Sequence, residues 1–278
     1  MKKNALTLSF EFFPPKTSDG IATLDNTVKE LITVNPDFFS VTFGAGGSTR
    51  DGTLETVKKL QKTKISIAPH LASVGLTRDE VKAIIKNYQD IGIKRVVAIR
   101  GDLPSGMGHV AELRYAHELV SLIRETVQDA FHIEVAAYPE MHPQAADASH
   151  DLQNLKKKIE AGANSAITQY FFNADAYFYY VDACRKEGIA IPIVPGIMPI
   201  THFAKLVRFS DMCGAEIPRW IRHRLEVYKD DPEALSAFGL EVVYMLCERL
   251  ISNGAPGLHF YTLNHHEPCV QLLKLLNL

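Results

Sequence analysis

Leu6 to Pro15 reads LTLSFEFFPP, an alternating apolar run that carries one carboxyl group, Glu11, and stops at two prolines. Such alternation is typical of a β-strand, and proline ends a strand because it has no backbone N–H to donate. Seven later runs have the same form, each short, apolar and closed by a polar or turn-forming residue. In chain order the eight runs are Leu6–Phe12, Phe38–Phe43, Ile65–Pro69, Arg95–Ile99, Ile133–Tyr138, Ser165–Tyr170, Ile191–Pro195 and Leu258–Leu263.

Helical patterns fill the gaps between these runs, and Thr77 and Glu80 form a capping box before one of them. Strands that alternate with helices indicate a parallel sheet, and eight such units close a barrel. Since a (β/α)8 barrel needs roughly 250 residues, the 278 residues predict an α/β fold with a single TIM-barrel domain over 1–278. Roughly sixty residues separate the last two runs, which predicts extra helices there, with breaks near Pro218 and Pro232.

The composition favours small-molecule partners. A net charge of −2 creates no field that would gather nucleic acid or an anionic membrane. The four cysteines are too widely spaced for a metal site or a disulfide scaffold, and no apolar leader or membrane-spanning run is evident. We therefore expect a cytoplasmic protein without metal, nucleic-acid or membrane partners.

Glu11 is the leading candidate for a catalytic group. Period-two geometry directs Ser9 and Glu11 into the barrel and Phe10 and Phe12 toward the helices. Burial raises the pKa of a carboxyl group, and a raised pKa is what a general acid needs near neutral pH. The alternative is a structural carboxylate paired with a nearby cation.

Other strand ends carry polar groups. Asp102 follows the fourth run and could pair with Arg100, or act with Glu11 as the two carboxylates of a glycoside hydrolase. Gln169, at the end of the sixth run, could form hydrogen bonds to the edge of a heterocyclic ligand, because its amide both donates and accepts. The alternative is a core amide whose hydrogen bonds are made within the protein.

A helical pattern after the fifth run carries a polar trio at spacings of three and four, consisting of Asp151, Asn154 and Lys158. The trio shares one helix face, which could bind a ligand or simply be solvated. His265-His266-Glu267 lacks the helical spacing of metal ligands, which disfavours metal catalysis.

Six motifs in one order, each at a strand end, together resemble the bacterial methylenetetrahydrofolate reductases. They are Phe10–Pro15, Ser40–Gly44, Ala68–Leu71, Arg100–Pro104, Ala137–Glu140 and Thr168–Phe172. The resemblance implies bound FAD, NADH as co-substrate, and ping-pong reduction of 5,10-methylenetetrahydrofolate to 5-methyltetrahydrofolate for methionine synthesis. It also implies a homotetramer.

The resemblance assigns roles to individual residues. Glu11 is implied to be the acid that opens the folate's five-membered ring, and Asp102 the carboxylate that contacts the pterin. Implied FAD contacts are Thr42, Phe43, Ala45, His70, Arg100, Gly101, Asp102, Tyr115, Tyr138, His142, Ala145, Asp151, Asn154, Lys157 and Lys158. Implied folate contacts are Asp102, Gln169, Lys205, Phe209 and His265, and implied NADH contacts are Thr42, Gln169 and Phe209. Lys205, His265 and Phe43 depart from the glutamine, arginine and tyrosine usual in the family.

Overall fold

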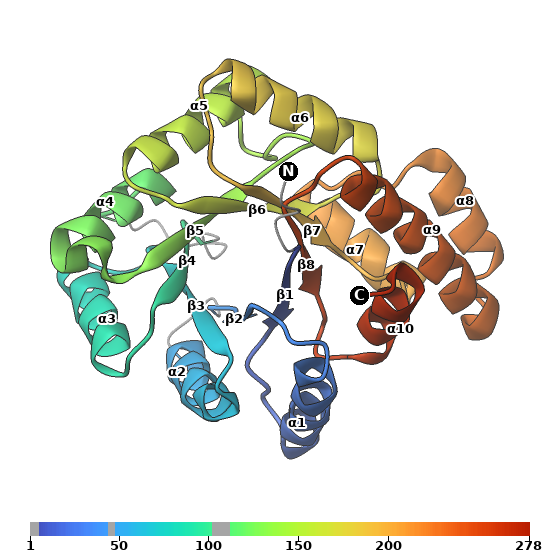
Figure 1. Cartoon of the computed structure of the whole chain (residues 1–278), viewed down its shortest axis with the longest axis horizontal. Coiled ribbons are helices and arrows are strands. Elements are labelled where there is room, and N and C mark those ends of the chain that lie inside the picture. Colours follow the sequence, from blue (N-terminus) through green and yellow to red (C-terminus); the bar gives the residue numbers. More distant parts are fainter. Residues whose placement is uncertain (1–5, 44–47, 102–111) are drawn as a thin grey trace.

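The computed structural model describes residues 6–43, 48–101 and 112–278. Its parallel strands follow chain order around a closed barrel, in which β1 also pairs with β8 (Figure 1). The strands are β1 Thr7–Phe12, β2 Phe38–Val41, β3 Ser66–Ala72, β4 Arg95–Ile99, β5 His132–Ala137, β6 Ser165–Tyr170, β7 Ile193–Ile197 and β8 Gly257–Tyr261. The predicted α/β barrel is therefore confirmed.

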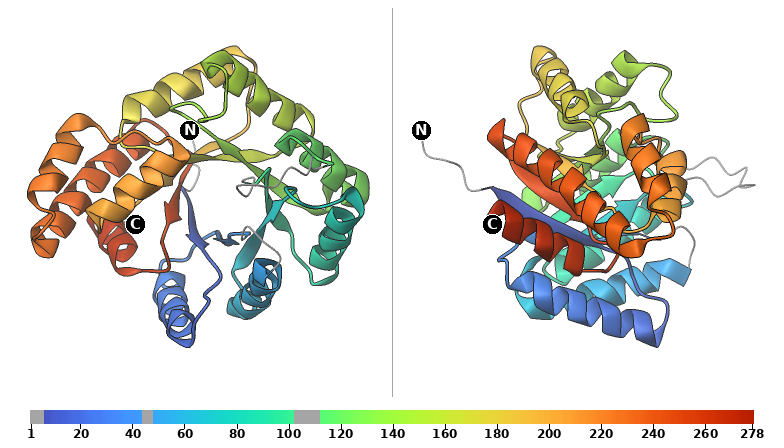
Figure 2. Two further views of the ribbon diagram at one scale, coloured as in Figure 1. Left: turned by 180° about the vertical axis from the view of Figure 1, so that it is seen from behind. Right: turned by 90° about the vertical axis from the view of Figure 1, so that its right-hand side faces the viewer.

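Helices surround the strands on the outside (Figures 1 and 2). They are α1 Ser18–Ile32, α2 Ser48–Leu60, α3 Arg78–Asp90, α4 Ala116–Val127, α5 Ala148–Glu160, α6 Ala174–Lys186, α7 Phe203–Cys213, α8 Arg219–Val227, α9 Pro232–Ser252 and α10 Glu267–Leu276. The extra helices expected between β7 and β8 are α7, α8 and α9, with Pro218 capping α8 and Pro232 in the first turn of α9. The Thr77–Glu80 capping box of α3 is also confirmed.

The faces of β1 follow the predicted alternation. Phe10 and Phe12 are fully buried in the main core between strands and helices. Ser9 and Glu11 point the other way, into the barrel. There the apolar side chains of Phe38, Ala68, Val97 and Ile167 form a separate, smaller core. The barrel interior is thus a packed core with polar side chains above and below it.

No helix in the described part of the chain combines the length and apolar character needed to cross a membrane.

Candidate active site

The loop that follows β8 fixes the end of β1. Thr262 Oγ1 donates a hydrogen bond to the backbone carbonyl oxygen of Glu11, with 2.6 Å between the two oxygens. The side chain of Asn264 pairs with both backbone groups of Phe13, accepting from N at 3.1 Å and donating to O at 2.9 Å. These bonds hold the backbone from Glu11 to Phe13, directly before the two prolines, so the segment that carries Glu11 is fixed at both Glu11 and Phe13.

Two imidazoles face the Glu11 carboxyl group. His70 Nε2, from β3, lies 3.2 Å from Glu11 Oε2, and His259 Nε2, from β8, lies 3.7 Å from the same oxygen. The Glu11 side chain is 18% exposed, so it reaches the mouth while most of its surface is covered.

This arrangement overturns the expectation that the pKa of Glu11 is raised. Burial does raise the pKa, and it is the largest single influence. The charge of His70 and the short-range polar contacts of His259 and His70 with the carboxyl group together outweigh it, and they lower the pKa from 4.5 to about 2. Only burial can be inferred from the residues around Glu11, because nothing local to β1 shows which side chains arrive from β3 and β8. The open alternative of a carboxylate paired with a cation describes this geometry better.

His259 is the residue that sequence reasoning missed. Its ring is fully buried, and Nδ1 lies 2.8 Å from Ser9 Oγ. The register of the barrel pairs Ser9 with His259 across β1 and β8. A possible signal was the histidine inside an otherwise apolar strand, but its partner is 250 residues away in sequence.

Tyr261 occupies the barrel interior next to Glu11, its backbone partner on β1. Its hydroxyl donates to the carbonyl of Thr168 at 2.7 Å. Gly196 makes room for the ring, because a Cβ there would lie 2.7 Å from Tyr261 Cε2 and 2.2 Å from Thr168 O. Burial raises the pKa of Tyr261, which therefore stays a neutral phenol.

The expected flavin contacts come from the ends of four neighbouring strands. Thr42 and Tyr138 directly follow β2 and β5, His70 lies two residues before the end of β3, and Arg100 and Gly101 follow β4. Gly101 has a φ of +85°, and a Cβ there would lie 2.6 Å from a methyl carbon of Val74. Glycine is therefore required at this position.

Two members of the predicted polar trio on α5 face β5. Asp151 is buried and accepts a hydrogen bond from the backbone N–H of His142 at 3.0 Å. Lys158 donates to the carbonyl of Ala136. Burial lowers the pKa of Lys158 to about 8, although Asp151 partly opposes the shift, and burial raises the pKa of Asp151. The predicted shared face is confirmed for these two residues, and Asn154 is half-buried beside them.

The loop between β5 and α5 brings further expected contacts together. The rings of Tyr138 and His142 meet edge to face with centroids 4.5 Å apart, and Ala145 N donates to His142 O. Arg100 reaches this loop and donates to the side chain of Gln144. Lys157 is exposed on α5.

The remaining expected residues are more scattered. The Gln169 Oε1 atom accepts a hydrogen bond from the backbone N–H of Tyr170 at 2.9 Å, so the oxygen of this amide already has a partner within the protein. Lys205 and His265 are exposed, Tyr115 is half exposed beside His117, and Phe209 packs against the core from α7. Phe43 also packs partly against the core. Asp102 and Ala45 lie outside the described residues, so the Glu11–Asp102 separation is not defined.

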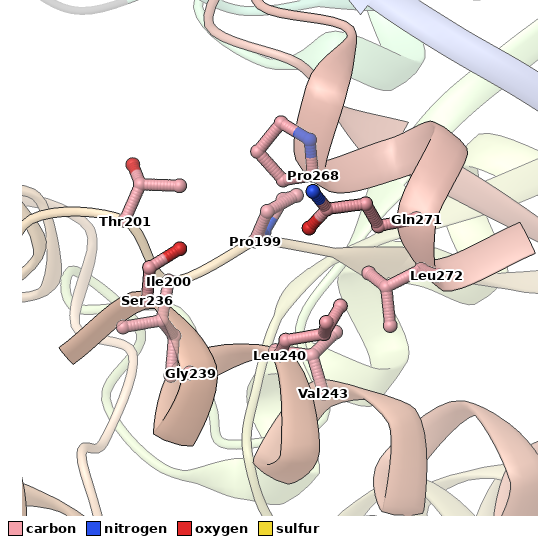
Figure 3. A pocket seen from close by; sticks show the side chains of 10 residues that line it. All are labelled: Pro199, Ile200, Thr201, Ser236, Gly239, Leu240, Val243, Pro268, Gln271 and Leu272. Atoms are coloured by element: carbon pink, nitrogen blue, oxygen red, sulfur yellow. The ribbon is translucent and has the colours of Figure 1, made fainter. Parts of the chain in front are cut away.

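A small pocket away from this cluster has a different character. It lies between the segment after β7 and helices α9 and α10 (Figure 3). Helix α9 packs closely there, because a Cβ on Gly239 would lie 2.3 Å from Ile200 O. None of the residues expected at the active site lines it, and we interpret it as a packing gap.

An α/β barrel with ionisable side chains gathered at the carboxyl ends of its strands defines an enzyme of the TIM-barrel class. The sequence profile of the family "Methylenetetrahydrofolate reductase" matches residues 1–277. The chain belongs to this family, and it is therefore an oxidoreductase.

Individual relatives agree with the family match. The chain is 42% identical to the 5,10-methylenetetrahydrofolate reductase of Salmonella typhimurium and 41% identical to that of Escherichia coli, covering 94% of this chain and 88% of each relative. It is 37% identical to "Methylenetetrahydrofolate reductase (NADH) 1" of Arabidopsis thaliana, covering 97% of this chain and 48% of that longer protein. A solved Clostridium thermocellum protein, described as binding two copies of 5-methyl-5,6,7,8-tetrahydrofolic acid, shares the fold. Its TM-score is 0.70 at 17% identity, over 99% of this chain and 96% of that one.

Proposed function

We propose that the protein reduces 5,10-methylenetetrahydrofolate to 5-methyltetrahydrofolate with FAD bound at the barrel mouth and NADH as electron donor. The two half-reactions alternate at one face of the flavin, in a ping-pong cycle whose product serves methionine synthesis. The position of Glu11 between two imidazoles, at the mouth of a barrel of this family, carries the proposal.

The chain offers a donor set suited to FAD. Arg100 reaches Gln144 in the loop after β5 and Lys158 reaches the carbonyl of Ala136 on β5, so these two side chains would provide the positive charge that a diphosphate needs. Lys158 is a half-buried cation that donates to the carbonyl of Ala136 and lies near the Asp151 carboxyl group. Gly101 leaves bare backbone where the ring system would approach. When bound, FAD would supply the hydride-carrying chemistry between NADH and folate.

Glu11 would manage the proton that this reduction consumes. Opening the five-membered ring of the substrate breaks a carbon–nitrogen bond, and the amine that leaves needs a proton. The Glu11 carboxyl reaches the mouth and has two imidazoles behind it, so a proton can pass through it to the substrate nitrogen. The carboxylate form would also stabilise the cation that develops on the methylene carbon.

Two relatives support the choice of substrates. The printed name of the Arabidopsis relative specifies NADH. The ligand named for the Clostridium structure, a 5-methyltetrahydrofolate, is the product of the proposed reaction. The resemblance further supports a cytoplasmic homotetramer with one catalytic domain over 1–278, and light scattering of the purified protein would measure the subunit number.

One experiment tests the cofactor and both substrates. The purified protein should be yellow with a flavin absorption spectrum. Under anaerobic conditions NADH should bleach that spectrum, and methylenetetrahydrofolate should restore it. A colourless protein that neither binds added FAD nor oxidises NADH would contradict the proposal.

The glycoside hydrolase alternative has lost its support, since the family match is to a reductase over nearly the whole chain. A colourless preparation that cleaves a chromogenic glycoside would revive it.

A further inference from the structure

Three side-chain atoms in the described ranges are buried without an aligned hydrogen-bond partner. They are Ser40 Oγ, His70 Nε2 and His259 Nε2. Buried polar groups are nearly always paired, so a cluster of exceptions calls for a reason. The two imidazole nitrogens both lie within ion-pair distance of Glu11 Oε2, although neither is aligned for a straight hydrogen bond. The exceptions therefore gather at the group that handles protons.

His259 is held so that it cannot turn away from Glu11. The phenyl ring of Phe38 stacks on the imidazole, with centroids 6.0 Å apart and planes at 25°. The ring of Tyr261 meets it edge to face at 5.4 Å. Ser9 Oγ lies 2.8 Å from Nδ1, which leaves Nε2 as the nitrogen directed at Glu11.

Ser9 suits a histidine that changes its proton count. A serine hydroxyl both donates and accepts hydrogen bonds. It can accept from Nδ1–H when the imidazole is charged or is neutral with its proton on Nδ1, and it can donate to Nδ1 when the neutral ring carries its proton on Nε2. The ring keeps its anchor in either state. An alanine would provide neither bond, and a carboxylate would favour only the charged state.

We propose that His259, anchored by Ser9, holds the proton that Glu11 delivers to the substrate. In this sequence the Nε2 proton of the His259 imidazolium passes to the Glu11 carboxylate, and Glu11 passes it to the amine nitrogen, where the electron pair of the breaking carbon–nitrogen bond takes it. Glu11 is then again a carboxylate, and His259 is a neutral ring whose Nδ1–H still donates to Ser9. Because the ring is fully buried, a proton taken up from solvent at the mouth reaches it through Glu11 and restores the imidazolium before the next turnover. This inference rests on the proposed function.

The proposal explains how a carboxyl group whose pKa is lowered can serve as an acid. The proton resides on an imidazole between turnovers and passes through Glu11 only when a base is present. The ionisable groups of the described chain around Glu11 are His70 from β3 and His259 and Tyr261 from β8, with Tyr138 of the segment after β5 acting on Tyr261. Since Tyr261 stays neutral, the two histidines are the available proton stores.

Kinetics of Ser9→Ala test the anchor, and Ser165→Ala is its matched control. Ser165 is also a buried serine inside the barrel that bonds a histidine, with Oγ 2.7 Å from His132 Nε2, but it lies at the opposite end. We expect Ser9→Ala to slow reoxidation of the reduced flavin by folate about tenfold. The ratio of the wild-type rate to the Ser9→Ala rate should grow as pH rises. The rate at which NADH bleaches the flavin should stay the same in both proteins. Ser9→Thr should restore most of the activity, and Ser165→Ala should retain wild-type rates at every pH.

Infrared titration provides a readout that needs no turnover. The Glu11 carboxyl band is identified by its absence in Glu11→Gln. Because His259 lowers the pKa of Glu11, His259→Asn should raise the midpoint of that band's titration, and Ser9→Ala should raise it by less. Identical midpoints in the wild type and both variants would overturn the inference.

The outcomes separate this inference from the proposed function. A wild-type protein that fails both half-reactions refutes the function, whereas the infrared midpoints still test the coupling of His259 to Glu11. An active wild type whose Ser9→Ala variant matches it at every pH refutes the inference alone. A loss in Ser9→Ala that is the same at all pH values would also refute it, since that is the signature of a purely structural role.

Discussion

Glu11 and Glu134 are both glutamates of the barrel interior, and each has a serine and a histidine beside it, yet they are partnered differently. Glu134, near the amino end of β5, is ion-paired with Arg95, accepts from Ser165 Oγ and has His132 Nε2 at 3.2 Å. Glu11, near the carboxyl end of β1, has two imidazoles in range and an aligned hydrogen bond from neither. Phe38 separates the two groups, with the Arg95 guanidinium 4.5 Å from its ring centre and His259 stacked on it.

The contrast distinguishes a carboxylate with a structural role, Glu134, from one that is proposed to transfer protons, Glu11. Glu134 is 2% exposed, so the solvation it loses has to be replaced by a permanent cation and hydrogen bonds. Glu11 keeps access to the mouth, and its partners are imidazoles, whose ring nitrogens can both donate and accept. Glu134 is therefore held as a carboxylate by its partners, whereas the imidazoles beside Glu11 can pass a proton to it.

The largest expected effect is that of Glu11→Gln on folate reduction. Removing the acid should slow the folate half-reaction about 1000-fold, within the range for general acids. Bleaching by NADH should continue, since that step needs no proton at the folate nitrogen. Anaerobic stopped-flow measurement of the two half-reactions checks this, and a normal folate rate would remove Glu11 from the mechanism.

Glu134→Gln should instead affect stability, by about 3 kcal/mol, because it leaves the Arg95 cation without its counter-charge. The measurement is the free energy of unfolding in urea, with Glu125→Gln as control. Glu125 pairs with Arg78 on the surface, where its side chain is 61% exposed, and its loss should cost less than about 1 kcal/mol. Equal effects of the two variants would show that the Glu134 cluster is no tighter than a surface pair.

Acid should reveal Glu11 as a stabilising carboxylate. Its pKa is lowered from 4.5 to about 2 in the folded protein, so the unfolded chain binds more protons in that window. Stability is therefore fully present above pH 4.5 and lost as pH falls toward 2, at up to about 1.4 kcal/mol per pH unit. Urea unfolding from pH 3 to pH 6 should show a shallower slope for Glu11→Gln than for the wild type. Parallel slopes would mean that the histidines do not hold this carboxylate ionised.

The smallest effect is expected from Thr77→Ala, far from both glutamates. Thr77 caps α3 with a hydrogen bond from Glu80 N, and its loss should cost about 1 kcal/mol. Both half-reactions should keep their rates, which makes the variant a baseline for stability loss without functional loss. A change in either rate would show that modest destabilisation alone reaches the site.

Much of the fold could be predicted from local pattern. β4 and β6 begin and end where the sequence predicts, and β7 begins two residues later than expected. Strand positions follow from apolar runs and the residues that stop them, and both are visible in a few neighbouring residues. The place of Glu11 at the mouth and the shared face of Asp151 and Lys158 follow from the same periodicities.

The protonation of the site could not be predicted in this way. Local pattern predicts a raised pKa for Glu11, because it indicates burial but not the approach of His70 and His259. Barrel closure brings β8 against β1, and so it puts His259 beside Ser9 and Glu11.

The sequence by itself determined the eight-stranded barrel, the family and the strand end that carries the acid, since these depend on short-range periodicity and on motifs read in order. Only the tertiary structure decided which groups share the proton. The pKa of a buried carboxyl depends on charges a few ångströms away in space, and barrel closure brings them from strands far apart in the chain.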